Sequence, residues 1–152
     1  MKSKEKNNID VVIRKMTIKD YDPLIALWKE GNIPYRPLGR DSKKNIRWQL
    51  QQPNCFYFVA EDEGTVIGAI LGTHDGRKGW INRLIITSSY RQRGIAKRLI
   101  EEVEHRLTVA GIDIVACLIE DWNVGSMQVF ERLGYTKHTD IFYYSKRKNI
   151  KT

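Results

Sequence analysis

Apolar and polar residues alternate with different periods along the chain, and the period predicts which segments are strands and which are helices. Residues 11–15 alternate weakly, as in a strand. A helix is predicted to begin at Thr17, which can cap its first turn, and to end at Gly31. Two prolines and a glycine predict a loop over residues 32–40, and a second helix is expected from residue 41 or 42 to about residue 51.

The middle of the chain predicts three consecutive strands followed by a long helix. Residues 56–61 and 65–73 flank a short hairpin turn, and a third strand is predicted over residues 80–87. Apolar residues then recur at helical spacing, which predicts an amphipathic helix from about residue 94 to residue 110. The apolar face of this helix is made of Ile95, Leu99, Ile100, Val103 and Leu107.

The last third of the chain predicts another strand, a shorter helix and further strands. Residues 114–119 form a continuous apolar run, which is typical of a strand covered on both faces. A helix over about residues 126–133 is expected to end at Gly134, and residues 135–146 are aromatic and β-branched enough for one or two final strands. The order of elements predicts a mixed α/β domain, with antiparallel strands first and a β-α-β unit at its centre.

Length and composition place the chain among globular proteins. Its 152 residues fit one domain, and 41% hydrophobic with 29% charged residues argue against a disordered or fibrous chain. The apolar runs are far shorter than the roughly 20 residues of a membrane-crossing helix, so we expect no membrane association. Residues 1–10 lack the apolar stretch of a signal peptide, and we therefore expect a cytoplasmic protein.

The cysteines and histidines bear on metal binding, and the net charge bears on the kind of binding partner. Cys55 and Cys117 have no neighbour at metal-ligand or redox spacing and the three histidines are scattered, so we expect no metal; Cys117 is expected to be a core residue. The formal net charge of +8 favours an anionic partner, which at this point is nucleic acid, an acidic protein or a phosphorylated cofactor.

Six residues between the predicted strand 80–87 and the long helix carry the clearest candidate chemistry. The first turn of a helix leaves backbone N–H groups unpaired and adds a partial positive charge. A glycine and an alanine let a ligand approach, and two arginines add full charges, so the segment is suited to binding a phosphate or pyrophosphate. Taken alone, the segment is equally consistent with an ordinary surface loop. Its residues are Arg91, Gln92, Arg93, Gly94, Ile95 and Ala96.

This hexapeptide resembles the R/Q-x-x-G-x-G/A signature of the GNAT superfamily of N-acetyltransferases. Residues 84–91 are similar to the fourth strand of that family and the turn before its pyrophosphate loop. Asn123 and the later sequence Phe-Glu-Arg-Leu-Gly-Tyr, residues 130–135, resemble a second family motif, so the similarity covers nearly the whole chain.

The resemblance implies a fold, a cofactor and a domain organisation. The expected fold is a mixed, mostly antiparallel sheet of six to seven strands, splayed between strands four and five and flanked by about four helices. The domain is expected over residues 10–147, with flexible ends at residues 1–9 and 148–152. The pantetheine arm of acetyl-CoA is expected in the splayed opening, between the backbone of Leu84, Ile85 and Ile86 on one side and Asn123 and Phe130 on the other.

The implied reaction is direct transfer of the acetyl group of acetyl-CoA to a primary amine of a small molecule, a protein N-terminus or a lysine. The backbone N–H of Ile86 is expected to polarise the thioester carbonyl. Glu120, just past the predicted strand 114–119, is the first candidate for the general base, although a solvated loop carboxylate is the alternative. Trp80, Asn82, Tyr35 and Arg36 are candidates for shaping the acceptor pocket.

The chain departs from the family where a proton donor for the leaving thiolate is expected. Phe130 stands at a position that is often tyrosine in the family, and it has no proton to donate. Either the thiol needs no acid because thiols are already acidic, or Tyr135 (failing that Tyr143 or Tyr144) replaces it, or the domain binds acyl-CoA without catalysis. Nucleic-acid binding is disfavoured, because pyrophosphate explains the charge nearest the motif; a homodimer is left open.

Overall fold

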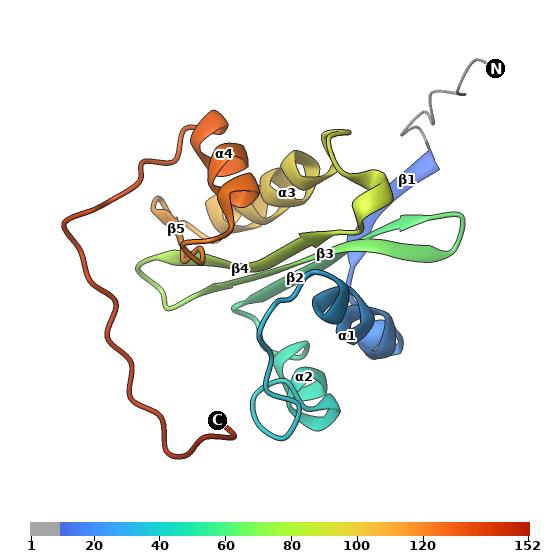
Figure 1. Ribbon diagram of the computed structural model, residues 1–152, viewed down its shortest axis with the longest axis horizontal. Helices are drawn as coiled ribbons and strands as arrows, with labels where there is room; N and C mark the ends of the chain where they lie inside the picture. Colours follow the sequence, from blue (N-terminus) through green and yellow to red (C-terminus); the bar gives the residue numbers. More distant parts are fainter. Residues whose placement is uncertain (1–9) are drawn as a thin grey trace.

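One five-stranded sheet forms the centre of the protein, whose computed structural model describes residues 10–152 (Figure 1). The predicted flexible N-terminus, residues 1–9, lies outside the described residues. Neighbouring strands are antiparallel except for β4 and β5, which are parallel. In sheet order the strands are β1 (Val11–Lys15), β2 (Cys55–Asp62), β3 (Thr65–His74), β4 (Gly79–Ile86) and β5 (Val115–Cys117).

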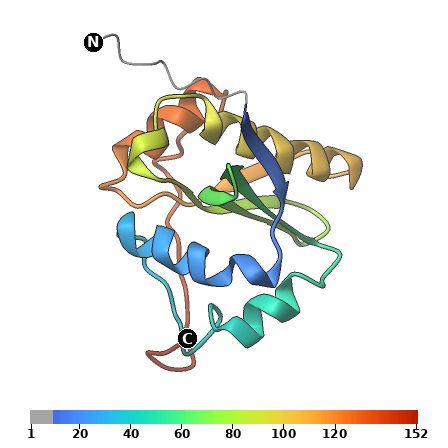
Figure 2. The same ribbon diagram turned by 90° about the vertical axis from the view of Figure 1, so that its right-hand side faces the viewer.

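Helices cover both faces of this sheet (Figure 2). On one face lie α1 (Tyr21–Glu30), which follows the short 3₁₀ helix η2 (Ile18–Asp20), and α2 (Lys43–Gln49). On the other face lie α3 (Ile95–Val109) and α4 (Val124–Arg132). A second 3₁₀ helix, η3 (Ser88–Tyr90), connects β4 to the segment that leads into α3.

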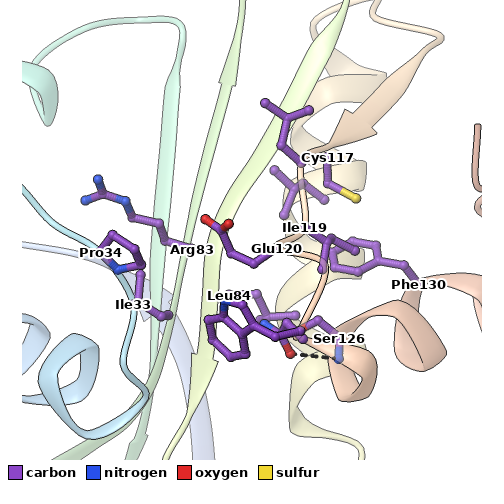
Figure 3. Close-up of a pocket in the computed structure, with 13 residues that line it drawn as sticks. Ile33, Pro34, Arg83, Leu84, Cys117, Ile119, Glu120, Ser126 and Phe130 are labelled. Carbon is purple, nitrogen blue, oxygen red and sulfur yellow. Dashed lines mark hydrogen bonds between the residues drawn. The ribbon is translucent and has the colours of Figure 1, made fainter. Parts of the chain in front are cut away.

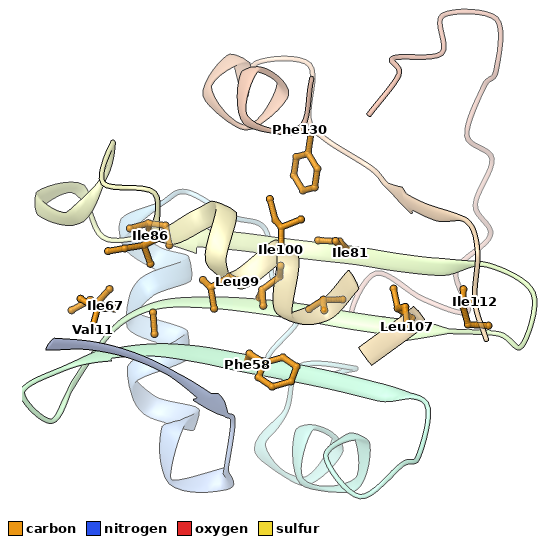
Figure 4. Close-up of a cluster of buried hydrophobic side chains, with 14 residues drawn as sticks. Val11, Phe58, Ile67, Ile81, Ile86, Leu99, Ile100, Leu107, Ile112 and Phe130 are labelled. Carbon is orange, nitrogen blue, oxygen red and sulfur yellow. The ribbon is translucent and has the colours of Figure 1, made fainter. Parts of the chain in front are cut away.

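The sheet has a separate hydrophobic core on each face, because successive strand residues point to opposite sides. In β2, Phe58 packs in the core under α3 (Figure 4), whereas its neighbours Tyr57 and Val59 pack in the core under α1. The α3 core includes Leu99, Ile100 and Val103, all fully buried, and so confirms the predicted apolar face of that helix.

Glycine lets α3 lie close to the sheet. A Cβ atom at Gly72 of β3 would come within 2.5 Å of Val103 Cγ1, and one at Gly79 of β4 would come within 2.5 Å of Leu107 Cδ1. Real Cβ atoms do not approach other carbon atoms so closely, so a side chain at either position would force Val103 or Leu107, or the helix that carries them, to shift.

The predicted opening between strands four and five is present. β4 pairs with β5 only over Gly79–Ile81, opposite Val115–Cys117. Beyond that point β4 contains a bulge: Asn82 pairs with Leu71 and Ile85 with Ala69, so two β4 residues face the single residue between them in β3. One of the two, Arg83, has a left-handed backbone with φ of 53°. The second half of β4 therefore diverges from β5 and is paired with β3 alone.

The strand count is lower than the six to seven that were predicted. The one or two strands expected over residues 135–146 do not form; in the structure this segment contains no strand and most of it is exposed. A strand needs a neighbouring strand to bond its backbone, and this segment pairs with none of the described residues. β5 is likewise shorter than the predicted 114–119, because β4 diverges after three residues, and α4 begins at Val124 rather than near residue 126.

None of the helices in the described residues is both long and apolar enough to span a bilayer.

Candidate active site

A pocket occupies the opening beside the second half of β4 (Figure 3). It contains about 520 Å³ of empty space, open solvent at its mouth included. Arg83, Ile33 and Pro34 lie toward one side of β4, and Cys117, Ile119 and Phe130 toward the other (Figure 3). The full lining is Ile33, Pro34, Ile81, Arg83, Leu84, Cys117, Leu118, Ile119, Glu120, Trp122, Asn123, Ser126 and Phe130.

The β4 wall of this pocket presents backbone groups. Thr87 N donates to Ile67 O, which is its partner in the β3 ladder. Because N–H groups of an antiparallel strand point alternately to its two edges, the backbone N–H and C=O of Ile86 point away from β3. The Ile86 carbonyl indeed accepts a hydrogen bond from Arg91 Nε at 3.0 Å. The pocket lining itself includes Leu84 but neither Ile85 nor Ile86. The side chains of Ile85 and Ile86 are buried in the α1 core and the α3 core respectively, so at these positions only backbone is offered to a ligand.

The segment from β4 to α3 exposes the start of the helix. Gly94 is the N-cap of α3 with φ of 76°, and no side chain among the described residues hydrogen-bonds to cap the helix there. A Cβ atom at Gly94 would meet nothing within 4 Å, so the backbone conformation and not crowding accounts for the glycine. Gln92 is also left-handed, with φ of 60°. The start of α3 therefore has a glycine with open space beside it and no side-chain cap, as suits an anion site.

The two arginines of this segment donate hydrogen bonds to backbone carbonyls a few residues earlier in the chain. Arg93 Nη2 donates to Ser89 O at 2.7 Å and its guanidinium lies 4.8 Å from the centre of the Tyr90 ring, while Arg91 is tied to Ile86. These contacts fix both positive charges beside the start of α3. The side chains of the next two predicted residues belong to the core: Ile95 is buried in the α3 core and Ala96 packs at its edge.

The α4 side of the pocket is built by Asn123 and Phe130. Asn123 caps α4, since its Oδ1 accepts from Ser126 N at 3.2 Å. Phe130 is buried and meets the ring of Tyr135 edge to face, with ring centres 4.9 Å apart. Both line the pocket, one as an amide at its rim and the other as an apolar wall.

Glu120 is the only carboxylate among the described residues that line the pocket. It lies in the loop after β5 and its side chain points toward β4 (Figure 3). The loop is closed by Asn123 N, which donates to the Glu120 carbonyl at 2.9 Å. Glu120 is exposed, so it is open both to a substrate and to the water that could relay a proton.

Tyr135 lies away from the pocket lining. Its hydroxyl donates to Glu104 Oε2 on α3 at 3.0 Å, and burial together with the Glu104 charge raises the pKa of the hydroxyl well above its usual range. Tyr143 and Tyr144 are 70% and 89% exposed and belong to the segment after α4 that forms no strand. None of the three tyrosines considered as proton donors therefore lines the pocket.

Several pocket residues were not singled out from the sequence. Cys117 was expected to be a core residue, and it does pack against the α3 core, but it also lines the pocket; burial raises the pKa of its thiol to about 11, which keeps it protonated near neutral pH. In the loop 32–40, Ile33 and Pro34 line the pocket in place of the suggested Tyr35 and Arg36. Trp122 was not proposed, and Trp80 and Asn82 are not part of the lining.

A buried ion pair ties the 32–40 loop to the bulge of β4. Arg83 Nη1 lies 2.6 Å from Asp41 Oδ1, without the alignment of a hydrogen bond, and the Arg83 guanidinium covers the Trp28 ring at 4.5 Å. Asp41 Oδ2 also accepts from Arg36 N at 2.6 Å. One carboxylate thereby holds the loop closed on itself and against β4. No sequence pattern links residues 42 positions apart, so this pair was not predicted.

Within the described residues, no three histidine, cysteine, aspartate or glutamate side chains lie together in a way that could hold a metal ion.

The comparison with known structures supports the fold. An aminoglycoside N-acetyltransferase, AAC(6')-Iy, in complex with the bisubstrate analogue CoA-S-monomethyl-acetylneamine superposes with a TM-score of 0.74 at 24% identity, covering 90% of this chain and 98% of that one. The PaiA N-acetyltransferase of Thermoplasma acidophilum, in complex with coenzyme A, gives 0.73 at 20% identity over 84% and 91%. A structure described as a transcriptional regulator from Bacillus halodurans gives 0.75 at 16% identity over 90% and 99%.

The sequence comparison identifies the family as well as the fold. The profile of the Acetyltransferase (GNAT) family matches residues 22–135, which contain the pocket, the β4 bulge and the start of α3. The chain belongs to the Acetyltransferase (GNAT) family.

Proposed function

We propose that the protein is an N-acetyltransferase that moves the acetyl group of acetyl-CoA directly to a primary amine. The proposal rests on three features around the second half of β4: the start of α3, which follows that strand in the chain, the edge of β4 beyond Ile81 that no described strand pairs with, and the Glu120 carboxylate in the pocket lining. The first suits the pyrophosphate of CoA, the second suits an extended pantetheine arm, and the third suits an amine.

The protein offers suitable groups both to the pyrophosphate and to the thioester of acetyl-CoA. The N–H groups at the start of α3, with Arg91 and Arg93 beside them, suit the pyrophosphate. The outward N–H of Ile86 suits the thioester carbonyl, and Leu84 and Phe130 offer apolar walls to the arm. Two structures of similar fold contain CoA or a CoA conjugate, which supports acetyl-CoA as the co-substrate.

In the proposed reaction the nitrogen loses two protons, the leaving sulfur gains one, and a C–S bond is exchanged for a C–N bond. Glu120 accepts a proton from the protonated amine, directly or through one water, and the freed lone pair attacks the thioester carbonyl. The Ile86 N–H stabilises the negative oxygen of the tetrahedral intermediate. The C–S bond then breaks as the amide forms, and the nitrogen releases its second proton to solvent. Solvent also protonates the CoA thiolate, because thiols ionise near pH 8.5 and need little assistance. Tyr135, held by Glu104, is not required as an acid.

The charges of the pocket favour an acceptor with one amine over a polycation. The described lining holds one carboxylate, Glu120, while its one guanidinium, Arg83, is already paired with Asp41, so the lining offers one unpaired carboxylate to one ammonium group. The whole chain is also positive, at +8, and repels polycations at long range. An amino-terminal peptide or a small monoamine satisfies these conditions better than an aminoglycoside, even though some proteins of similar fold act on aminoglycosides.

Thiol release from acetyl-CoA tests the proposal. The purified protein would be assayed against monoamines, peptides with free N-termini, lysine peptides, polyamines and aminoglycosides, with mass spectrometry of each product. We expect acetylation of at least one primary amine and a lower kcat/KM for polycations than for monoamines. If CoA binds but no amine in the panel is acetylated, the direct-transfer proposal fails and a binding role takes its place. A preference for polycations would overturn only the proposed acceptor class.

A further inference from the structure

An exposed tryptophan, Trp122, belongs to the lining of the pocket. Trp122 is 54% exposed, although tryptophan is on average a highly buried residue type. Among the described residues its ring stacks on no other aromatic ring and carries no cation. A large apolar ring that lines a pocket without a partner of its own is suited to packing against an apolar group of a ligand.

The loop after β5 presents Trp122 together with the Glu120 carboxylate. Both residues line the pocket, whereas Asp121 between them does not. Two backbone hydrogen bonds fold this loop. Asn123 N donates to Glu120 O at 2.9 Å, and the next N–H, that of Val124, donates to the Trp122 carbonyl at 3.0 Å. One short, hydrogen-bonded turn therefore offers a ring and a negative charge to the same pocket.

The loop 32–40 adds further apolar side chains to this pocket. Ile33 and Pro34 both line it, and they lie on the opposite side of β4 from Phe130 (Figure 3). Ile33 N donates to Trp28 O at 2.9 Å, which holds this part of the loop against the end of α1. Apolar side chains from two loops thus contribute to the pocket that contains the Glu120 carboxylate.

The lining offers one free charge and few hydrogen-bonding groups. Arg83 is paired with Asp41, so Glu120 is the one charged side chain of the lining without an ion-pair partner among the described residues. Asn123 Oδ1 already accepts a hydrogen bond from Ser126 N. The rest of the lining is apolar. A polyhydroxylated or polycationic amine would leave most of its polar groups without partners here, whereas an amine with one apolar group would not.

We propose that the pocket binds a small arylalkylamine as the acceptor, that is, a primary amine joined to an aromatic ring by a short aliphatic chain. Its nitrogen lies at Glu120 and its ring packs on Trp122. These two residues are separated by one position in the same turn, so a short chain can join the two contacts. The pantetheine arm of acetyl-CoA takes part of the same pocket, and the space that remains suits a small molecule. This inference rests on the proposed function, because it names the acceptor of that reaction.

Binding to the CoA-saturated protein tests the site without chemistry, because CoA carries no acetyl group to transfer. Phenylethylamine and ethanolamine are the matched ligands, since both are two-carbon primary amines and only the first has a ring. Titration calorimetry of the full chain should show phenylethylamine binding tighter by about tenfold or more, the scale on which apolar pockets discriminate added apolar groups.

Variants at two exposed tryptophans assign that preference to one residue. Trp122→Ala should remove the preference for phenylethylamine, and Trp122→Phe, which keeps an aromatic face, should retain most of it. Trp48→Ala is the matched control, because Trp48 lies on α2, is 62% exposed and is not part of the pocket lining. This control should keep the full preference.

Steady-state rates with acetyl-CoA connect the site to the reaction. In the wild type, kcat/KM for phenylethylamine should exceed that for ethanolamine by about tenfold or more, and in Trp122→Ala this ratio should fall toward one. A peptide with an N-terminal phenylalanine presents an amine and a ring on a larger molecule, and it should react more slowly than phenylethylamine.

The possible failures of this inference and of the proposed function give different results. Equal binding and equal kcat/KM of the two amines, a preference that survives Trp122→Ala, or faster reaction of the peptide would each overturn the small arylalkylamine acceptor and leave direct transfer standing. Trp122-dependent binding of phenylethylamine without acetylation of any amine would uphold the binding site and overturn the proposed function.

Discussion

The two halves of β4 differ in how their edges are paired. Over Gly79–Ile81 the strand is paired on both edges, with β3 and with β5, and α3 packs directly on it. Beyond the bulge at Arg83 it is paired with β3 alone, and its other edge borders the pocket. The fully paired half fixes the position of the open half, and the open half keeps the backbone groups that a substrate can use. A single left-handed residue, Arg83, lies at the transition between them.

The largest expected effect comes from closing the anion site that adjoins the open half. Gly94→Glu places a bulky negative charge at the start of α3 and forces a side chain into a left-handed conformation. We expect CoA to stop raising the melting temperature, a gain worth about 2.7 kcal/mol at 100 times the dissociation constant. Gly76→Glu is the matched control, since Gly76 also has a positive φ and open space around it but lies in the β3–β4 turn. A normal CoA-induced shift in Gly94→Glu would place the cofactor elsewhere.

Removing the ion pair at the transition should destabilise the fold. Arg83→Met leaves Asp41 buried with only the exposed Arg40, 3.9 Å away, as a cation. Losing one partner of a buried pair costs about 3–5 kcal/mol, and we expect a loss toward the lower end. Arg83→Met/Asp41→Asn should recover part of the loss, because no uncompensated charge then remains buried. Urea unfolding of the single and double variants measures the coupling. Equal stability of wild type and Arg83→Met would mean that the pair does not hold the bulge.

Glu120→Gln tests the carboxylate that faces the open half. As a general base that accepts a proton from the amine, Glu120 should give kcat/KM a limb that rises with pH. The glutamine variant should lose that rise and fall by about 10²-fold or more. Asp121→Asn changes the next residue, which does not line the pocket, and should keep the wild-type profile. An unchanged rate and profile in Glu120→Gln would assign the proton to water or to another group.

The Phe130 ring, which lines the pocket, should matter more for packing than for catalysis. Phe130→Tyr is expected to keep or raise turnover, whereas Phe130→Ala should weaken CoA binding and cost about 3 kcal/mol of stability because Phe130 is buried. Calorimetric titration with CoA and steady-state rates separate the two effects. A tyrosine variant that binds CoA normally but has no turnover would contradict this view of Phe130 as a wall.

The smallest effect is expected at Tyr135. Tyr135→Phe removes one hydrogen bond to Glu104 and should cost about 1 kcal/mol of stability while kcat stays close to that of the wild type. A loss of kcat by 10²-fold, with its pH dependence altered, would restore Tyr135 as the acid.

The sequence predicted those features that local rules determine. The hairpin between β2 and β3, the apolar face of α3 and the glycine before that helix depend on neighbouring residues, and all appear in the structure as expected. Long-range contacts were harder to predict. The Arg83–Asp41 pair, and the contribution of Ile33 to the pocket, depend on how a loop folds over a distant strand. The final strands were predicted from composition alone, which indicates that a segment suits a strand but not that a partner edge is within reach.

The central claim is that the open half of β4 receives the cofactor arm as an added strand. Residue-resolved amide hydrogen exchange, with and without CoA, tests it directly. The Ile86 N–H points away from β3, so its exchange should be fast in the free protein and slow markedly on CoA binding. Ile81, which lies in the half already paired with β5, should change little. If CoA binds while the exchange of Ile86 stays unchanged, the cofactor does not pair with β4 and the account is wrong.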